Sequence, residues 1–210
     1  MKIWKYKNYQ EYLDTQIEFT EQKMVNNPSW VNPLDIQGLV RYIFEYNPDV
    51  KFGLCHGTRR GLEQIEFINT FSKLNKDVKV IGTEINPSVA KKYPNTIEWD
   101  FSKIKDEWVN SVDFIFTNSF DHCYDPHKTL DLWMSCLNEN GLCIIEWTES
   151  DINSRAGDPF GATYEEYKEL FTKKYDIVDI AEGCIQDESI FSQVSLKQLD
   201  RYYFIIRNKE

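Results

Sequence analysis

The strongest constraint on the fold is an alternation of short β-rich runs and helical patterns that begins near Asp49. Each run is followed by a helical segment, at roughly 30 residues per unit. Such units form right-handed crossovers between parallel strands, and their helices cover both faces of the sheet. The sequence therefore predicts an α/β fold with a doubly wound, mostly parallel sheet. The expected strands are 50–55, 78–83, 96–99, 112–117 and 141–147.

The segments between these strands carry helix signals. Asn86 and Asp125 each precede a proline, which places an N-cap side chain before a proline at the first helical position. Thr163 and Glu166 have the spacing of a capping box. Apolar stripes at helical spacing run through Leu62, Ile65, Ile68, Phe71 and Leu74, and through Leu130, Trp133, Met134 and Leu137.

Two further strands are expected at 175–181 and 201–207, which brings the sheet to seven strands. A polar connection of nearly twenty residues separates them, and connections of that length are typically functional or mobile. Another polar, loop-like stretch, 148–162, follows the fifth strand.

Two amphipathic helices are expected before the alternating region. The first lies within 7–24; the second lies within 35–48, with Asp35 at its N-cap and Pro48 as its stop. The larger side chains of the first helix fall mostly on one face: Tyr9, Leu13, Ile17 and Met24, with Tyr12 beside them.

We expect residues 1–48 to form an N-terminal helical cap on a Rossmann-like domain at 49–210, the two making one compact unit. The aromatic residues of the cap are expected to pack on the sheet, or alternatively to line a ligand pocket. These residues are Trp4, Tyr6, Tyr9 and Tyr12.

Charge and cysteine content exclude several classes of protein. The chain has 24 Lys and Arg against 34 Asp and Glu, a net charge of −10, and no basic block, which disfavours binding to nucleic acid. It has no apolar stretch of the roughly 18 residues that a membrane span needs, and its start lacks the apolar core of a secretory signal. We therefore expect a cytoplasmic protein that does not bind membranes. The 5 cysteines are scattered without a C-x-x-C pair, so we expect reduced thiols and no metal site.

Four predicted strands end in unusual polar or glycine-containing segments. The first is followed by 56–61, in which Gly57 and Gly61 allow close approach of a ligand. Glu84 follows the second strand and Asp100 the third. The fourth is followed by 118–126, which contains Asn118, Ser119, Asp121, His122 and Asp125. Ligands of open α/β sheets bind beyond the carboxyl ends of the strands, so these segments are expected to form one site.

Together these residues describe a site for adenosine. An acid after the second strand suits the two ribose hydroxyls, and Asp100 after the third is placed to accept from an adenine amino group. The glycine spacing of 53–61 is neither G-x-G-x-x-G nor a phosphate-binding loop. Nicotinamide and ATP are therefore less favoured as ligands.

At this point the chain resembles the class I S-adenosylmethionine-dependent methyltransferases, a Rossmann-like superfamily with seven strands. The resemblance covers about 49–207 and rests on the segments GLCHGTRRGLEQ, GTEINP, IEWDF, NSFDHCYDP and LNENGLCIIEW. They are similar to a branch with a CHGTR-type first motif. The chain departs from the superfamily pattern at Cys55, where an acid is usual, and at Arg59, where the central glycine is usual.

The resemblance implies S-adenosyl-L-methionine as cofactor and S-adenosyl-L-homocysteine as product, and it assigns a part of the cofactor to each loop. The methionine end would face the backbone of His56, Gly57 and Thr58; the ribose would face Glu84, with Ile85 beside it; the adenine would face Asp100 and the amide of Phe101; and the amino end would face Asn118 and Ser119. We add Arg59 as the partner of the cofactor carboxylate, because guanidinium pairs bidentately with carboxylate.

The expected reaction is an in-line displacement at a methyl group that its sulfonium already activates, so that positioning supplies much of the rate. A hydroxyl acceptor would need a base, and Asp121 with His122 is the nearest candidate pair. We expect a small-molecule acceptor and O-methylation, with a sugar or phosphorylated precursor of surface polysaccharide as an example. An anionic acceptor would need no base. Glu146, Glu149 and 158–161 are further candidates for the acceptor pocket.

Two alternatives stay open. The altered glycine motif also suits a non-catalytic module or sensor that binds adenosine or S-adenosylmethionine, and a nucleotide-sugar or NAD-dependent enzyme is a third reading. A DNA base methyltransferase is disfavoured because 118–126 lacks the N/D-P-P-aromatic pattern. Charge alone does not exclude methylation of RNA or protein.

Overall fold

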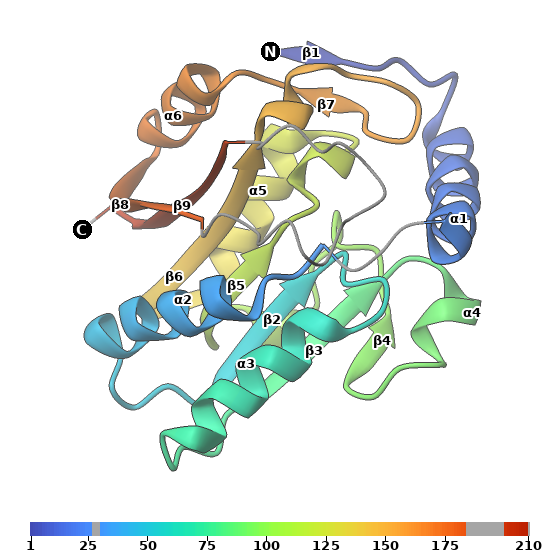
Figure 1. Cartoon of the computed structure of the whole chain (residues 1–210). Helices are drawn as coiled ribbons and strands as arrows, with labels where there is room; N and C mark the ends of the chain where they lie inside the picture. The colour runs from blue at the N-terminus through green and yellow to red at the C-terminus, as the bar shows by residue number, and fades with distance from the viewer. Residues whose placement is uncertain (27–29, 184–199, 210) are drawn as a thin grey trace.

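A computed structural model of the chain, which describes residues 1–26, 30–183 and 200–209, contains a seven-stranded sheet of order β4-β3-β2-β5-β6-β9-β8 (Figure 1). Neighbouring strands are parallel except at β9, which is antiparallel to both β6 and β8. The predicted doubly wound, mostly parallel sheet is confirmed. The strands are β2 (Phe52–His56), β3 (Lys79–Glu84), β4 (Thr96–Glu98), β5 (Val112–Thr117), β6 (Leu137–Thr148), β8 (Tyr175–Glu182) and β9 (Arg201–Asn208).

Helices cover both faces of this sheet and bury two apolar clusters. On one face, α2 (Pro33–Tyr46) and α3 (Leu62–Lys73) pack against β2, β5 and β6. On the other face, α5 (Pro126–Cys136) and α6 (Tyr164–Thr172) pack against the same strands. The α2 helix lies in the same layer as α3 and covers the sheet, so it packs as part of the sheet domain. The domain division at residue 48 stays a prediction.

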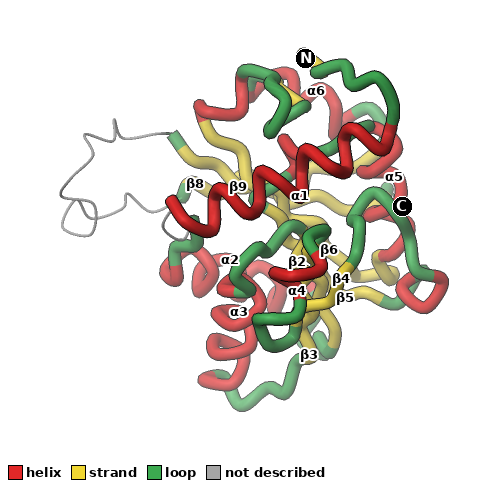
Figure 2. The backbone as a smooth tube through the Cα atoms, turned by 90° about the vertical axis from the view of Figure 1, so that its right-hand side faces the viewer, coloured by secondary structure: helices red, strands yellow, loops and turns green. Residues whose placement is uncertain are grey.

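The N-terminal segment lies along the side of the molecule where the parallel strands end (Figure 2). It consists of β1 (Lys2–Ile3) and α1 (Tyr9–Asn26), and β1 pairs antiparallel with β7 (Phe160–Gly161). The α1 helix contacts several loops of that edge: the Thr20 hydroxyl donates to Glu84, and Arg60 donates to the carbonyl of Met24. The loops also contain the short α4 (Pro87–Ala90) and the 3-10 turns η1 (Asp106–Trp108), η2 (Phe120–His122) and η3 (Glu149–Ile152).

The start of α2 corrects one prediction. Asn32 is the N-cap, because its side chain accepts a hydrogen bond from the backbone N–H of Leu34 at 3.0 Å, and Pro33 occupies the first turn. Asp35 therefore lies inside the helix, where it is buried and accepts from the Tyr203 hydroxyl at 2.8 Å. The Asn-Pro pair is the same signal that correctly marks the start of α4 at Asn86.

The predicted apolar stripe of α3 is also wrong in part. Phe67 and Phe71 are fully buried, whereas Leu74 is 48% exposed. The first turns of α3 bury polar side chains instead, because these turns pack against polar groups near the strand ends. Gln64 donates to the Thr96 hydroxyl at 2.8 Å, and Glu63 faces a cavity.

The inward face of α1 differs from the prediction for a similar reason. Tyr12 and Gln16 are its buried residues, while Leu13, Ile17 and Met24 are only partly buried. This helix packs across polar strand-end loops, so polar side chains form much of its contact with the domain. The capping box of α6 and the N-cap Asp125 of α5 are confirmed.

Other predictions are tested only where the structure describes the chain. The four described cysteines are free and buried: Cys55, Cys123, Cys136 and Cys143. Cys184 and the polar connection between the last two strands lie outside the described residues. No helix in the described ranges has the length and apolar character that crossing a membrane requires.

Candidate functional site

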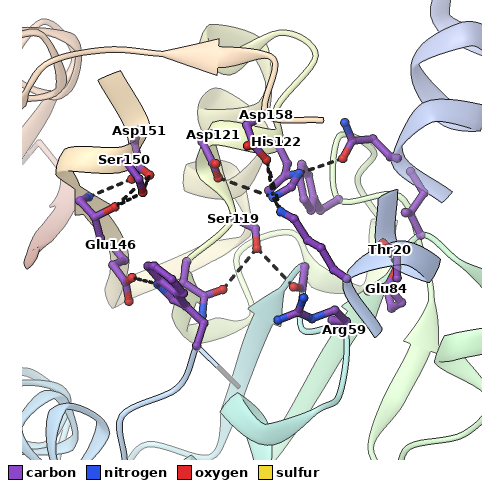
Figure 3. A pocket seen from close by; sticks show the side chains of 18 of the residues that line it. Thr20, Arg59, Glu84, Ser119, Asp121, His122, Glu146, Ser150, Asp151 and Asp158 are labelled. Atoms are coloured by element: carbon purple, nitrogen blue, oxygen red, sulfur yellow. Dashed lines mark hydrogen bonds and ion pairs between the residues drawn. The ribbon is translucent and has the colours of Figure 1, made fainter. Parts of the chain in front are cut away.

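A cavity of about 280 Å³ lies at the carboxyl ends of β2, β3, β5 and β6, between these ends and α1 (Figure 3). Its wall includes residues from the segments that follow β2, β3, β4, β5 and β6, from the first turn of α3 and from α1. Of the residues predicted to bind a cofactor or perform catalysis, the following line it: Gly57, Arg59, Glu84, Ile85, Phe101, Asn118, Ser119, Asp121 and His122. These residues from several strand ends therefore lie around one cavity, and their roles stay predictions.

The turn after β2 brings its backbone close to the loop after β5. Gly57 and Gly61 have φ angles of 73° and 69°, and Arg59 also has a positive φ, 38°, which is uncommon outside glycine. A Cβ at Gly57 would lie 2.6 Å from the Cβ of Ser119, so only glycine fits there. The Gly57 and Thr58 amides both donate to the Thr83 carbonyl, at 3.0 and 3.1 Å. The turn is therefore fixed by backbone contacts and turns Arg59 toward the cavity.

His56 and Thr58 are not among the residues that line the cavity. The His56 ring is 2% exposed and stacks on Trp133 with ring centroids 4.9 Å apart, and its Nδ1 lies 2.9 Å from the Thr83 hydroxyl. Burial lowers the pKa of His56 to about 3, so the ring is neutral at pH 7. These two side chains pack inside the domain, and only their backbone remains a predicted cofactor contact.

Glu84 ends β3 with its side chain almost fully buried, at 3% exposure. Its Oε1 accepts from the backbone N–H of Asn86 at 2.8 Å and from the Thr20 hydroxyl at 3.4 Å. Burial raises the pKa of this carboxyl group. The carboxylate is thus held in place by its own loop and by α1 while it lines the cavity (Figure 3).

The loop after β4 contributes Phe101 to the cavity wall, but Asp100 is not part of that wall. The Asp100 carboxylate accepts hydrogen bonds from the Tyr9 hydroxyl and from the backbone N–H of Ser102, and it pairs with Lys103 at 3.5 Å. The structure therefore brings Phe101 together with Glu84 and Gly57, and engages Asp100 with the N-terminal helix. An adenine contact of Asp100 stays a prediction.

Glu63 is a cavity residue that the sequence patterns above do not single out. This residue lies in the first turn of α3, is 6% exposed, and accepts from the Asn118 side chain through Oε1 at 3.1 Å. Burial raises its pKa to about 7, although its own backbone N–H, the Asn118 side chain and Arg59 act in the opposite direction. The signal that could have identified it is an acid directly after the glycine-containing turn that follows the first strand.

His122 belongs to a polar cluster that joins η2, α1 and the loop before β7 (Figure 3). Its Nε2 lies 3.3 Å from the Lys23 ammonium and 3.4 Å from Asp158, and Lys23 lies 3.3 Å from Asp158. Gln16 donates through Nε2 to the Gly157 carbonyl, so its Oε1 accepts from His122 Nδ1 at 2.8 Å. His122 therefore carries its proton on Nδ1 and directs the Nε2 lone pair at Lys23.

The two predicted catalytic residues differ in basicity. Burial, together with the charge of Lys23, lowers the pKa of His122 to about 3. Burial and the nearby carboxylates of Asp151 and Asp158 raise the pKa of Asp121 well above its ordinary value. Asp121 is consequently the stronger proton acceptor of the pair.

Ligand atoms of Asp121, His122 and Asp158 lie within 4.8 Å of one another, a spacing that a metal ion could bridge. However, the Lys23 ammonium already contacts two of these three residues. It would have to move before a metal ion could bind, and it already supplies positive charge at this position. This donor set does not fit a resident metal ion.

The end of β6 forms the remaining wall. Glu146 is buried, accepts from the Trp30 indole and lies 3.6 Å from Arg201 Nε, and burial raises its pKa to about 7 against the effect of Arg201. Asp151 accepts from the Thr148 backbone N–H at 2.9 Å. Of the further candidates for an acceptor pocket, Glu146 and Asp158 line the cavity, whereas Glu149 is exposed and 159–161 do not line it. Among the cap aromatics, Tyr12 lines it and Trp4 is 45% exposed.

Comparison with known proteins shows which solved structures share this fold. No family model matches the chain, and no curated protein does. Among solved structures it is similar to the plantazolicin methyltransferase BpumL in complex with a monoazolic desmethylPZN analog and SAH, with TM-score 0.64 and 14% identity over 95% of this chain and 96% of that one.

Two further solved structures give the same result. One is the complex between the Haloferax volcanii Trm112 methyltransferase activator and the putative methyltransferase, with TM-score 0.62, 12% identity, and coverage of 98% of this chain and 100% of that one. The other is a putative S-adenosylmethionine-dependent methyltransferase from Listeria monocytogenes, with TM-score 0.58, 10% identity, and coverage of 81% and 97%. The chain therefore has the Rossmann-like fold of class I methyltransferases; the branch with a CHGTR-type motif stays a prediction.

Proposed function

We propose that this chain is an S-adenosylmethionine-dependent methyltransferase that acts on a small-molecule acceptor. One observation carries the proposal: Gly57, Glu84 and Ser119, from the ends of three neighbouring strands, line a single cavity in a fold shared with methyltransferases. This is the position at which open α/β sheets bind their ligands. Fold alone does not define an activity, so the proposal rests on the site.

The charges of the cavity fit such a cofactor. Among the described lining residues six are acidic and three are basic: Glu63, Glu84, Asp121, Glu146, Asp151 and Asp158, against Lys23, Arg59 and Arg155. Burial raises the pKa of several of these carboxyl groups, and a ligand that carries a sulfonium and an ammonium would favour their ionised forms. The bound cofactor would supply a methyl group that its sulfonium activates toward a nucleophile.

In this proposal, different residues bind different parts of the cofactor. Glu84 accepts from the ribose hydroxyls, because its carboxylate is already oriented by the Asn86 amide. Ile85 and Phe101 supply the apolar part of the wall for the purine. Arg59 pairs with the cofactor carboxylate, and the Gly57 turn, which lines the cavity, faces the methionine chain.

The acceptor would lie toward β5 and β6. For a hydroxyl acceptor, and hence the expected O-methylation, Asp121 takes the proton and His122 stays neutral beside Lys23. The surrounding carboxylates favour a neutral or amine-bearing molecule, including an unphosphorylated sugar, over a phosphorylated polysaccharide precursor. The proposed location of the protein is the cytoplasm.

Calorimetry with S-adenosylmethionine, S-adenosylhomocysteine and NADH tests the cofactor assignment. We expect binding of the first two and none of NADH; preferential binding of NADH would support the nicotinamide alternative. Incubation with methyl-labelled cofactor and a small-molecule extract of cells then tests catalysis. Tight cofactor binding without any labelled product would favour the sensor, for which the altered glycine turn is the motivating observation.

A further inference from the structure

One oxygen of a buried carboxylate in the cavity wall has no hydrogen-bond partner. Glu63 is 6% exposed, and its Oε1 accepts from the Asn118 side chain at 3.1 Å. Its Oε2 is buried and accepts no hydrogen bond from any of the described residues. A buried carboxylate oxygen without a donor is costly unless a ligand supplies one.

The place of Glu63 indicates what that ligand group is. It follows the turn that contains Gly57 and Arg59 by a few residues, and it contacts Asn118 from the loop after β5. This is the part of the cavity in which the proposed function places the amino-acid end of the cofactor. In the proposed function Arg59 pairs with the carboxylate of that end. The ammonium of the same end then needs a negative charge beside it.

Other nearby groups do not supply that charge. Cys55 is fully buried, and burial raises the pKa of its thiol well above the ordinary value, so it is neutral at pH 7. Ser119 offers only a neutral hydroxyl, which donates to the Gly57 carbonyl at 3.3 Å. Glu146 has other partners, since it accepts from Trp30 and pairs with Arg201.

We propose that Glu63, through Oε2, binds the α-ammonium of S-adenosylmethionine. This inference rests on the proposed function and adds to it a residue of α3 that binds the amino-acid end of the cofactor. Asn118, predicted to face that end, holds the carboxylate in position through the hydrogen bond to Oε1. The ammonium of the cofactor would then donate to the oxygen that has no other donor.

The proposal implies that cofactor binding releases a proton. The charged and titratable groups around Glu63 are Arg59, which lowers its pKa, Glu146, which raises it, and the neutral Cys55. Their balance with burial leaves the Glu63 pKa at about 7, so part of the population is protonated before the cofactor binds. An ammonium partner favours the carboxylate, so the affinity should rise as pH rises toward 7.

Two ligands and two variants test the proposal at pH 7 by calorimetry. S-adenosylhomocysteine carries the ammonium and the carboxylate, whereas 5′-methylthioadenosine is a nucleoside thioether that lacks both. We expect Glu63→Gln to weaken S-adenosylhomocysteine at least tenfold. The same variant should bind methylthioadenosine within about twofold of wild type. Glu66→Gln, on the same helix but outside the cavity wall, should change neither affinity.

The pH dependence gives a second readout. From pH 5.5 to pH 7, the affinity of the wild type for S-adenosylhomocysteine should rise roughly tenfold more than that of Glu63→Gln. Equal affinity of wild type and Glu63→Gln for S-adenosylhomocysteine would overturn the inference. An equal loss of affinity for both ligands would overturn it too, because the substitution would then affect nucleoside binding or the fold. Failure of the wild type to bind either ligand would instead overturn the proposed function.

Discussion

The two halves of the cavity are built in different ways. The proposed cofactor half uses backbone: the turn at Gly57 is fixed by amides that donate to the Thr83 carbonyl, and Glu84 is held by the Asn86 amide. The proposed acceptor half uses side chains that are distant in sequence, as in the Lys23 pairing with Asp158. The first half is therefore mainly a product of strand-end loops, to which α1 adds the longer contact from the Thr20 hydroxyl to Glu84 at 3.4 Å. The second half depends on the N-terminal helix for Lys23 itself.

The largest effect that this comparison predicts is at Asp121. Replacement of Asp121 by Asn removes the stronger base of the acceptor half, and we expect methyl transfer to a hydroxyl acceptor to fall about 10²- to 10⁴-fold. Affinity for S-adenosylhomocysteine should stay within about threefold, since the cofactor half is intact. Transfer of the labelled methyl group at saturating cofactor is the measurement.

A matched variant is His122→Asn, which we expect to lose less activity because the pKa of His122, at about 3, makes it a weak base. Undiminished activity of Asp121→Asn would contradict the assignment and indicate an acceptor that is already anionic.

A smaller effect is expected in the cofactor half. Glu84→Ala should weaken binding of S-adenosylmethionine at least tenfold, because a charged bidentate contact to the ribose is lost. Asp100→Asn should cost less, about threefold or under, since the Asp100 carboxylate is engaged by Tyr9 and does not line the cavity. Calorimetry of both variants measures the difference, and an unchanged affinity in Glu84→Ala would refute the ribose placement.

The smallest effect concerns His56, which packs beneath the cofactor half. Its folded pKa is about 3 against 6.5 for the free side chain, so below pH 6.5 the unfolded chain binds more protons and stability falls as pH falls. From pH 8 to pH 6 this group should lower the free energy of unfolding by about 0.8 kcal/mol.

Denaturant unfolding at the two pH values checks this. His56→Phe, which keeps an aromatic ring beside Trp133, should show a correspondingly smaller loss, and the exposed His127→Gln should behave as wild type. An identical pH dependence in His56→Phe and the wild type would show that His56 is not held neutral by the fold.

The same contrast explains how much the sequence could predict. The strands, the N-caps Asn86 and Asp125, and the cavity residues Gly57 and Glu84 follow from local periodicity and turn chemistry. The place of Asp100 could not be predicted in this way, because its partner Tyr9 lies 91 residues away in the chain. Tertiary contacts of that kind leave no local signal.

Helix faces were harder to predict wherever a helix covers loops. On α3, Glu63 and Gln64 are buried because they meet the cavity and Thr96, so apolar spacing gave the wrong inward face. On α1, the same cause turned Gln16 and Lys23 toward the strand ends. By contrast, α5 packs on the apolar face of the sheet, and its predicted stripe from Leu130 is buried.

A crystal structure of the chain with S-adenosylhomocysteine tests the central claim most directly. We predict that the ribose hydroxyls contact Glu84, that the amino-acid end lies between Arg59 and Glu63, and that the sulfur faces Asp121. A ligand bound outside this cavity, or a Glu84 side chain turned away from a ligand inside it, would contradict the account.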